Sequence, residues 1–482
     1  MFSLLLLTIL SLSFILLTLY RGLSRVYPLN KIPGPLHAKF TSIPLKYIDF
    51  TGQRTRYVHR MHKTYGPVVR IAPNEVIFAS SPAVKEIYCS SGSGYDKTEF
   101  YNLFTPFNTR TMFSTLGKDE HAKRKRTLAD RYANSNIMRS CLGGISERAG
   151  RFLNLASKGG RLDLYIALHS YAFDCVTYHM FHPFGANSLE DGKDEDIMKE
   201  VTMDSSMQNR LVQYWNPTLH GILGKGLRLF GVKPRELPLA NDFVWGNTTS
   251  DEKREAAPFT LVDRLRGSEA MGDIEVAAEC ADHMAAGIDT TGDALCFLMW
   301  ELSLDRSRVY QDRLREEILD NPGVSWDKLE FLDAVVMEGL RCFPAIPMSL
   351  PRYVPRGGRT IDGYFVPGGT IVSCQAYSMH RIPEVFPDPD TFRPERWLEV
   401  EGDAERRRHF FAFANGGRGC VGKHLAIAEM KTLLTAVYSR FSTLPDPDMK
   451  HDEMEMDDQL ISSRPKGQRC LLRFTPLDEA AK

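Results

Sequence analysis

The chain has 482 residues, of which 43% are hydrophobic, and 60 basic side chains balance 60 acidic ones. This is the composition of a globular protein with ample apolar material for a large core, and the zero net charge gives no reason to expect nucleic acid as a partner. The nine cysteines are scattered singly without a Cys-x-x-Cys, which argues against a zinc ribbon, a thioredoxin-type motif and a disulfide framework.

The first segment, residues 1–20, reads MFSLLLLTILSLSFILLTLY and contains no charged side chain. About 20 apolar residues cross a bilayer as a helix, so a transmembrane anchor is predicted. Arg21, Arg25 and Lys31 follow, and the positive-inside rule then predicts a cytosolic body. A cleaved signal peptide is the alternative, but the segment lacks a basic start and a small-x-small cleavage site. Residues 21–35 predict a basic and proline-rich hinge.

The longest predicted helix runs from Ile274 to about Leu304, after a capping Asp273. Its residues are apolar on every face, which is typical of a helix in the middle of a large protein. Its centre, AAGIDTTGD at 285–293, holds two glycines and two adjacent threonines, which are poor helix formers. Two interpretations remain open: close packing against a neighbouring helix, or a distortion beside a ligand.

A second helix is predicted from about Leu332 to Cys342, where it stops before a proline. Glu338 and Arg341 lie three residues apart and therefore share one helix face. Exposed pairs of this kind are common and contribute little stability. The spacing alone is therefore a weak signal.

Strands are expected next, because residues 351–374 combine Gly-Gly turns with short β-branched runs that are typical of hairpins. The proline-dense residues 380–397 predict an irregular segment. Since the remaining patterns are helical, the expected fold class is mostly α with a small β-sheet region (α+β).

Residues 413–424, FANGGRGCVGKH, combine a Gly-x-Gly-x-x-Gly pattern with one cysteine, Cys420. A dinucleotide-binding turn needs an acidic residue about 20 positions on, where the chain has only Asp446 after a proline. A thiolate fits better, because Cys420 precedes a predicted helix at 423–438 and helix N-termini favour negative charge. A cysteine nucleophile requires a nearby histidine base, but His424 points along that helix. A zinc site requires more cysteines. Heme iron bound by one thiolate remains.

The pattern Phe413-x-x-Gly416-x-Arg418-x-Cys420-x-Gly422 resembles the heme-binding signature of the cytochrome P450 family. AGIDTT at 286–291 resembles the family's distal-helix motif. FRPERW at 392–397 resembles the motif whose arginine, Arg396, completes a structural triad with Glu338 and Arg341. The anchor and hinge resemble microsomal members, and YGPVVRIAPNEV at 65–76 resembles filamentous-fungal ones. The resemblance covers about residues 30–475.

This resemblance implies a cytochrome P450 fold, with one large heme-thiolate domain at 36–482 behind the transmembrane helix. It implies heme b with Cys420 as the axial iron ligand. It also implies Asp289 as the carboxylate that relays protons to bound dioxygen, and Thr290 as the hydroxyl that steadies the iron-bound oxygen through a hydrogen bond. The implied cofactor-binding residues are Cys420, Phe413, Gly416, Arg418, Gly422, Arg352, and Arg124 or Lys125.

The choice between Arg124 and Lys125 stays open. HAKRKR at 121–126 places His121 and Lys125 where the family often has a tryptophan and an arginine that reaches a heme propionate. A solvated basic helix face is the other interpretation of this segment.

The implied activity is a monooxygenase that oxidises a hydrophobic small molecule with dioxygen and electrons from an NADPH-cytochrome P450 reductase. By resemblance the substrate pocket is lined from residues 101–113, 284–286, 345–350 and 460–463, and the pathway is one of fungal secondary metabolism. The expected location is the endoplasmic reticulum membrane, single-pass, with the catalytic domain in the cytosol. The alternatives are a heme-thiolate isomerase or dehydratase that uses no dioxygen, and a non-catalytic membrane-anchored binding protein.

Overall fold

The computed structural model describes residues 12–13, 15–17, 19–20, 27–204, 207–232, 235–249, 255–268 and 271–477. Helices dominate and the strands form small sheets, so the expected fold class is confirmed. The helices of six or more residues are α2 (Ile43–Phe50), α3 (Arg54–Tyr65), α5 (Lys118–Leu128), α7 (Leu142–Ser157), α8 (Leu164–Phe181), α9 (Gly192–Thr202), α10 (Arg210–Trp215), α11 (Pro217–Leu229), α12 (Pro238–Thr248), α13 (Leu261–Arg266), α14 (Asp273–Ser303), α15 (Arg308–Asp320), α16 (Glu330–Cys342), α18 (Asp403–His409) and α19 (Lys423–Tyr438).

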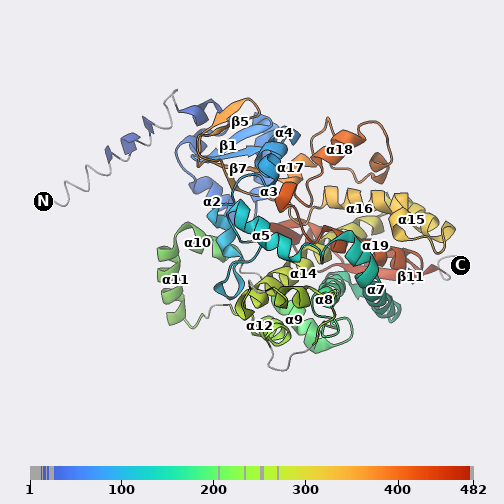
Figure 1. The fold of residues 1–482 in the computed structure, drawn as a ribbon. Coiled ribbons are helices and arrows are strands. Elements are labelled where there is room, and N and C mark those ends of the chain that lie inside the picture. The colour runs from blue at the N-terminus through green and yellow to red at the C-terminus, as the bar shows by residue number, and fades with distance from the viewer. Residues whose placement is uncertain are drawn as a thin grey trace.

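Four small sheets and hairpins lie around this helical body (Figure 1). The largest has the order β1-β2-β7-β4, in which β2 and β7 are parallel, and lies near the N-terminus; a second has the order β3-β11-β8. Two hairpins, β5–β6 and β9–β10, complete the set. The strands are β1 (Val68–Ala72), β2 (Glu75–Phe78), β3 (Arg161–Asp163), β4 (Arg352–Tyr353), β5 (Arg359–Ile361), β6 (Tyr364–Val366), β7 (Ile371–Cys374), β8 (Phe441–Pro445), β9 (Met456–Gln459), β10 (Ser462–Pro465) and β11 (Leu471–Pro476).

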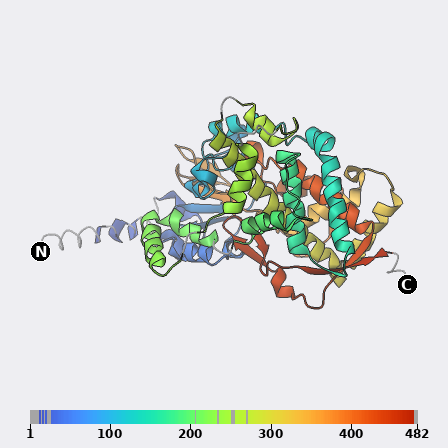
Figure 2. The ribbon, with the colours of Figure 1, turned by 90° about the horizontal axis from the view of Figure 1, so that it is seen from below.

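Helix α14 runs through the middle of the molecule and packs most extensively against α8 (Figures 1 and 2). It is helical without interruption from Asp273 to Ser303. The interpretation of its glycines as a distortion is therefore wrong. A Cβ at Gly287 would lie 2.6 Å from a methyl carbon of Val176 on α8, so the glycine permits close packing of two helices.

The start of α14 also differs from the expectation. The cap is Gly272, whose N–H donates to the carboxylate of Glu275 at 3.0 Å, while Asp273 is the first helical residue. Asp273 remains in the first turn, where its negative charge interacts favourably with the helix dipole.

The predicted anchor at 1–20 lies mostly outside the described residues. Among the helices that the structure describes, none has the length and apolar character needed to span a bilayer. The hinge segment is described from residue 27 onward, and there it packs against the body. Leu29 and Ile32 are buried, and the carbonyl of Pro33 accepts a hydrogen bond from the backbone N–H of Arg70 at 2.8 Å.

Candidate functional site

The cysteine loop lies between the irregular segment at 380–397 and α19. Cys420 comes two residues before Gly422, the residue that caps α19. Its backbone N–H donates to the carbonyl of Phe413 at 2.9 Å, which closes the loop into a tight turn. Gly416 is required there, because its φ is +74° and a Cβ would lie 2.1 Å from the carbonyl oxygen of Tyr88. FFAF at 410–413 is not a strand, so the dinucleotide-binding interpretation is wrong.

Cys420 differs from the other cysteines in its exposure. Its side chain is exposed, Cys89 is half-buried, and the other seven are buried. Although solvent reaches the sulfur, the surrounding protein raises the pKa of its thiol, and the N–H groups of Gly422 and Lys423 together with the ammonium of Lys125 oppose that effect. The loop thus aims backbone donors and positive charge at one accessible sulfur, which is the environment that a thiolate ligand requires.

Five basic side chains converge beside this loop. Lys97 and Arg352 are partners in an isolated β-bridge. Arg418 donates to the backbone carbonyls of residues 93, 95 and 116. Lys125 donates from Nζ to the carbonyls of residues 417 and 419 at 2.9 and 3.3 Å. His121, the fifth member, is buried and its Nδ1 has no hydrogen-bond partner.

Protein carboxylates balance the charges of this cluster only in part, through the effect of Asp282 on Lys97 and of Asp119 on Arg418. Within the described residues its one ion pair joins Arg418 to the exposed Asp96 at 3.7 Å. Burial and the neighbouring cations lower the pKa of Lys97 well below its usual value, that of Arg418 to about 10 and that of His121 to about 2. A buried cluster of this kind calls for an anionic ligand. The two carboxylates of heme b meet that need, so these residues fit the cofactor.

Arg124 and Lys125 point in different directions. The guanidinium of Arg124 lies 3.5 Å from Glu275 and 3.6 Å from Glu279, both in the first turns of α14. Lys125 is the residue of the two that reaches the cysteine loop. The α5 segment is therefore not a uniformly solvated basic face.

Asp289 and Thr290 lie in the middle of α14. Thr290 donates from Oγ1 to the carbonyl of Ala286 at 2.6 Å. Asp289 accepts from the hydroxyl of Thr202 at 3.0 Å. Burial and the nearby Asp293 raise the pKa of Asp289 to about 6. Its carboxyl group can therefore take up and release a proton near neutral pH.

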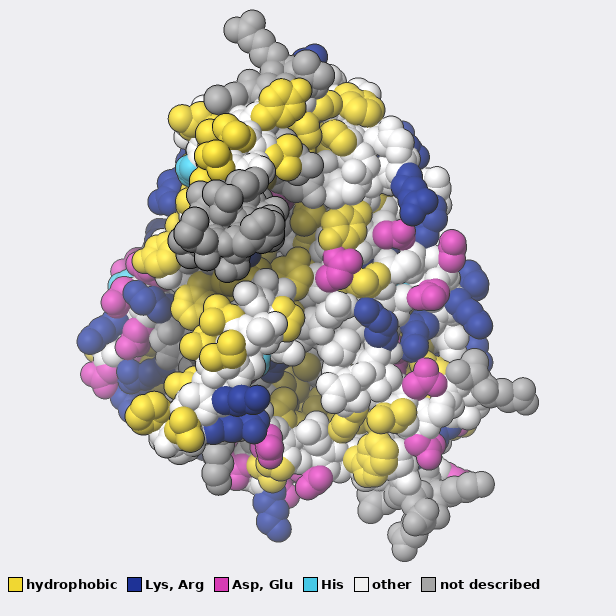
Figure 3. Space-filling view, turned by 90° about the vertical axis from the view of Figure 1, so that its left-hand side faces the viewer, with side chains coloured by type: hydrophobic (Ala, Val, Ile, Leu, Met, Phe, Trp, Pro, Cys, Tyr) yellow, Lys and Arg dark blue, Asp and Glu magenta, His cyan; other side chains and the backbone are white. Residues whose placement is uncertain are grey.

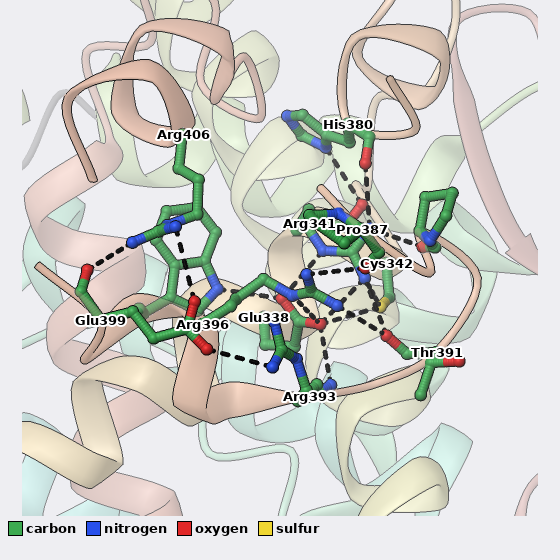
Figure 4. A network of polar contacts seen from close by, with 12 residues as sticks. Glu338, Arg341, Cys342, His380, Pro387, Thr391, Arg393, Arg396, Glu399 and Arg406 are labelled. Atoms are coloured by element: carbon green, nitrogen blue, oxygen red, sulfur yellow. Dashed lines mark hydrogen bonds and ion pairs between the residues drawn. The ribbon is translucent and has the colours of Figure 1, made fainter. Parts of the chain in front are cut away.

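Glu338, Arg341 and Arg396 are brought together in one buried network (Figure 4). Arg341 donates to both oxygens of Glu338 at 2.8 and 2.9 Å, and Arg396 donates at 3.0 Å. The indole N–H of Trp397 and the backbone N–H of Arg393 donate to the same carboxylate, each at 2.9 Å. The network connects α16 to the proline-dense segment and makes no contact with the sulfur of Cys420. Its contribution is therefore to the stability of the fold.

Two functional candidates were missed by the sequence analysis. Lys97 stands alone in its segment, and only the fold brings it beside Arg352. Glu429, on α19, is buried and its pKa is raised well above the usual value by that burial, with an opposing hydrogen bond from Thr291. An acidic residue on an otherwise apolar helix face was the available signal for Glu429. For Lys97 the sequence carried no comparable signal.

Comparison with known proteins decides the family. The model of the family described as cytochrome P450 matches residues 33–471. The chain is a member of the cytochrome P450 family. This P450 is 30% identical over 471 residues to the cytochrome P450 monooxygenase tazI of Aspergillus terreus, with 93% of this chain and 94% of that protein covered. It is 28% identical over 469 residues to the cytochrome P450 monooxygenase stcB of Emericella nidulans, with 93% and 89% covered.

Membership in this family fixes the class of reaction and the cofactor. The protein is an oxidoreductase that incorporates oxygen, and its cofactor is heme iron. P450 monooxygenases act on small molecules and need a redox partner. The chain covers nearly the full length of both relatives.

Proposed function

We propose that this P450 oxidises a hydrophobic small molecule with dioxygen and with electrons from an NADPH-cytochrome P450 reductase, in a secondary-metabolite pathway. The observation that carries the choice of oxygen chemistry is the pairing of Asp289 with Thr290 on the buried helix α14. An isomerase or dehydratase that uses no dioxygen would not need an acid and a hydroxyl at this place.

When bound through Cys420, the heme supplies the redox chemistry at oxygen. The protein groups have separable tasks. Lys97, Arg352 and Arg418 bind the carboxylates of the cofactor. Asp289 holds and releases a proton at its carboxyl oxygen. The hydroxyl of Thr290 donates its hydrogen to the carbonyl of Ala286, and its oxygen lone pairs remain available to accept a hydrogen bond.

The substrate pocket is expected from segments that meet near α14. The short helix Pro106–Asn108 packs against α14, and the backbone N–H of Ser463 donates to the carbonyl of Ala345 at 3.0 Å. The first contact brings segment 101–113 to the helix that contains residues 284–286, and the second joins segment 345–350 to segment 460–463. Their side chains are largely apolar, which favours a hydrophobic substrate.

The reductase is expected to dock beside the cysteine loop. Candidate basic residues near this loop are Lys423 and the arginines at 406–408. Arg407 and Arg408 pair with carboxylates of their own helix α18, and Arg406 is buried. Lys423 is exposed at the start of α19, so it is the best candidate for contact with an acidic partner.

A membrane location is supported by one exposed apolar surface near the N-terminus (Figure 3). Helix α11 buries none of its residues, and Leu229 and Phe230 at its end are 88% and 86% exposed. The exposed apolar residues of α2 and of the α11 region are Ile43, Tyr47, Phe50, Leu219, Ile222, Leu223, Leu227, Leu229 and Phe230. We propose that this surface, here named the apolar face, rests on the endoplasmic reticulum membrane beside an anchor at 1–20, with the catalytic domain in the cytosol.

The proposed function is tested by untargeted comparison of metabolites from cells with and without the protein, followed by reaction of the purified holoenzyme with reductase, NADPH and ¹⁸O₂. We expect one product to gain one labelled oxygen per turnover. A product that forms without label and without NADPH would instead indicate an isomerase or dehydratase. A heme spectrum without any new metabolite, in cells that supply all precursors, would contradict catalysis.

A further inference from the structure

Two buried side chains beside Asp289 take no part in the chemistry described so far. His169 of α8 is 0% exposed and Asp293 of α14 is 3% exposed. The Nε2 of His169 lies 3.4 Å from Oδ1 of Asp293. Gly292 makes this approach possible, because a Cβ at that position would lie 2.7 Å from Cδ2 of the imidazole.

The partners of His169 determine how many protons this pair holds. Its Nδ1 lies 2.7 Å from the backbone carbonyl of Tyr165. A carbonyl can only accept, so Nδ1 carries a hydrogen. Nε2 and Oδ1 lie at ion-pair distance, and neither atom has another hydrogen-bond partner among the described residues. A second proton shared between them keeps two lone pairs from facing each other. Burial acts to lower the pKa of His169, but the carboxylates of Asp293 and Asp289 outweigh it and raise that pKa. Burial also raises the pKa of Asp293, and the hydrogen bond and charge of His169 oppose that effect. The two directions together favour an imidazolium beside a carboxylate.

Asp289 belongs to the same charged cluster. It lies four residues before Asp293 on α14, so the two carboxyl groups share one helix face. The charge of Asp293 makes Asp289 harder to ionise, while His169 and Arg464 make it easier. Arg464 enters from β10, and its Nη1 donates to the backbone carbonyl of Thr202 at 3.3 Å. Two carboxylates thus face one imidazolium and one guanidinium, which leaves the ionised cluster neutral.

The other titratable groups that face the cluster stay uncharged. The phenol of Tyr165, on α8, has its pKa raised by burial and by both aspartates. The thiol of Cys296, on α14, has its pKa raised well above the usual value by burial, with its contact to Cys470 acting in the same direction. Besides burial and the hydrogen bond from Thr202, the charge state of Asp289 therefore depends on three charged groups: Asp293, His169 and Arg464.

We propose that His169 and Asp293 act as one positioning pair, which keeps the carboxyl group of Asp289 in the charge state that lets it donate protons to the distal side. The proposal rests on the proposed function, because it assigns a role to neighbours of its acid. Two adjacent buried carboxyl groups without a counter-charge share one proton. The imidazolium removes that conflict, so Asp289 can release its proton and regain it without disturbing Asp293.

The first test uses no turnover. We would label the histidines of the full-length holoenzyme with ¹⁵N and follow the imidazole shifts with pH, assigning His169 by its loss in His169→Gln. We expect His169 to be charged at pH 7 and Asp293→Asn to lower its titration by about one unit or more. A neutral His169 at pH 7 in the unmodified protein would overturn the proposal, whatever the variants do.

The second test measures product per NADPH and the solvent isotope effect across pH 6–9. Loss of the imidazolium in His169→Gln raises the pKa of Asp289. The alkaline limb of the pH profile of product per NADPH should therefore move to higher pH by about one pH unit. In the double variant H169Q/D293N both charges are gone, so the limb should return toward its original position. The control Thr177→Val removes a buried hydroxyl of α8 that donates to the carbonyl of Phe173 at 2.7 Å. This control should lower stability without moving the alkaline limb. If His169 were only structural, His169→Gln would behave in the same way.

The variant Asp289→Asn separates the two proposals. If it changes the isotope effect while His169→Gln and Asp293→Asn do not, the positioning pair is refuted and the role of Asp289 stands. If Asp289→Asn itself leaves coupling and isotope effect unchanged, the acid of the proposed function is wrong, and the pair has nothing to position.

Discussion

The Nε2 of His380 accepts a hydrogen bond from the backbone N–H of Phe411 at 2.8 Å. Its Nδ1 faces the carbonyl of Arg341 at 3.1 Å. Burial lowers the pKa of His380 well below its usual value, so the ring is neutral and donates from Nδ1. One imidazole thus connects the Glu338 network to Phe411, which lies two residues before the start of the cysteine loop at Phe413. The network supports the loop from this side without contacting the sulfur.

Replacement of Cys420 is expected to abolish the thiolate-type heme spectrum. The test is Cys420→Ser, read as the Soret band of the reduced carbon monoxide complex. The matched control is Cys89→Ser, because Cys89 is the other cysteine that is not fully buried. Persistence of the red-shifted band in Cys420→Ser would remove Cys420 as the axial ligand.

Glu338→Ala is expected to lower the free energy of unfolding by about 3–5 kcal/mol, because it leaves two buried guanidinium groups without their carboxylate. Glu405→Ala is the control. Glu405 and Arg408 have the same i, i+3 spacing but are 49% and 64% exposed, so the change should be about 0–1 kcal/mol. Denaturant unfolding and heme content of both variants check this, and equal losses would contradict it.

Thr290→Ala should keep heme binding and the substrate-induced spectral shift but lower the yield of product per NADPH, with peroxide as the main outlet. General acid–base groups contribute about 10²–10⁴-fold, so the loss should be plain. Ser303→Ala is a matched control, since Ser303 makes the same hydroxyl bond to the carbonyl four residues back, at 2.7 Å, at the far end of α14. Unchanged product per NADPH in Thr290→Ala would remove this hydroxyl from the mechanism.

Lys97→Met should have opposite effects with and without heme. In heme-free protein the variant removes a buried charge that its neighbours repel, so the free energy of unfolding should rise. In the holoprotein it would remove a cation that we expect to bind a heme carboxylate, so heme should dissociate about tenfold faster or more. Lys123→Met, at an exposed position on the same α5 as Lys125, should change neither. A loss of stability in both forms would show a purely structural lysine.

The apolar face is tested with a chain that lacks residues 1–20, so that an anchor cannot mask weaker contacts. Leu229→Asp with Phe230→Asp should abolish flotation of this chain with phospholipid vesicles, because charges replace side chains that would enter the interface. Val400→Asp is the control, since Val400 is 94% exposed but lies outside the apolar face. Equal flotation of both variants would show that these two side chains do not hold the membrane.

Local patterns predicted much of the architecture. The helix expected at 423–438 coincides with α19, and those expected at 274–304 and 332–342 lie within two residues of α14 and α16. Periodicity and proline positions are local signals, and they suffice for such elements. The motif residues Phe413 to Gly422 also lie, as expected, in a tight turn directly before α19.

Contacts between distant segments were beyond the sequence. Lys97 joins the cation cluster only because a β-bridge sets it beside Arg352. The glycines at 287 and 292 suggested a distortion as readily as close packing, because the decisive neighbours, Val176 and His169, lie more than 100 positions earlier. No local pattern reports which side chain a folded chain presses against a glycine.

The attachment of Pro33 to Arg70 limits how far the body can move from an anchor. Leu29 is already buried, and only nine residue steps separate it from Tyr20 in the sequence. Nine residues, even fully extended, span about 30 Å. A bilayer that holds the first 20 residues would therefore keep the body from tumbling, and the same side of the enzyme would face the lipid throughout turnover. A substrate dissolved in the membrane would then be met by diffusion in two dimensions, without a search through the cytosol.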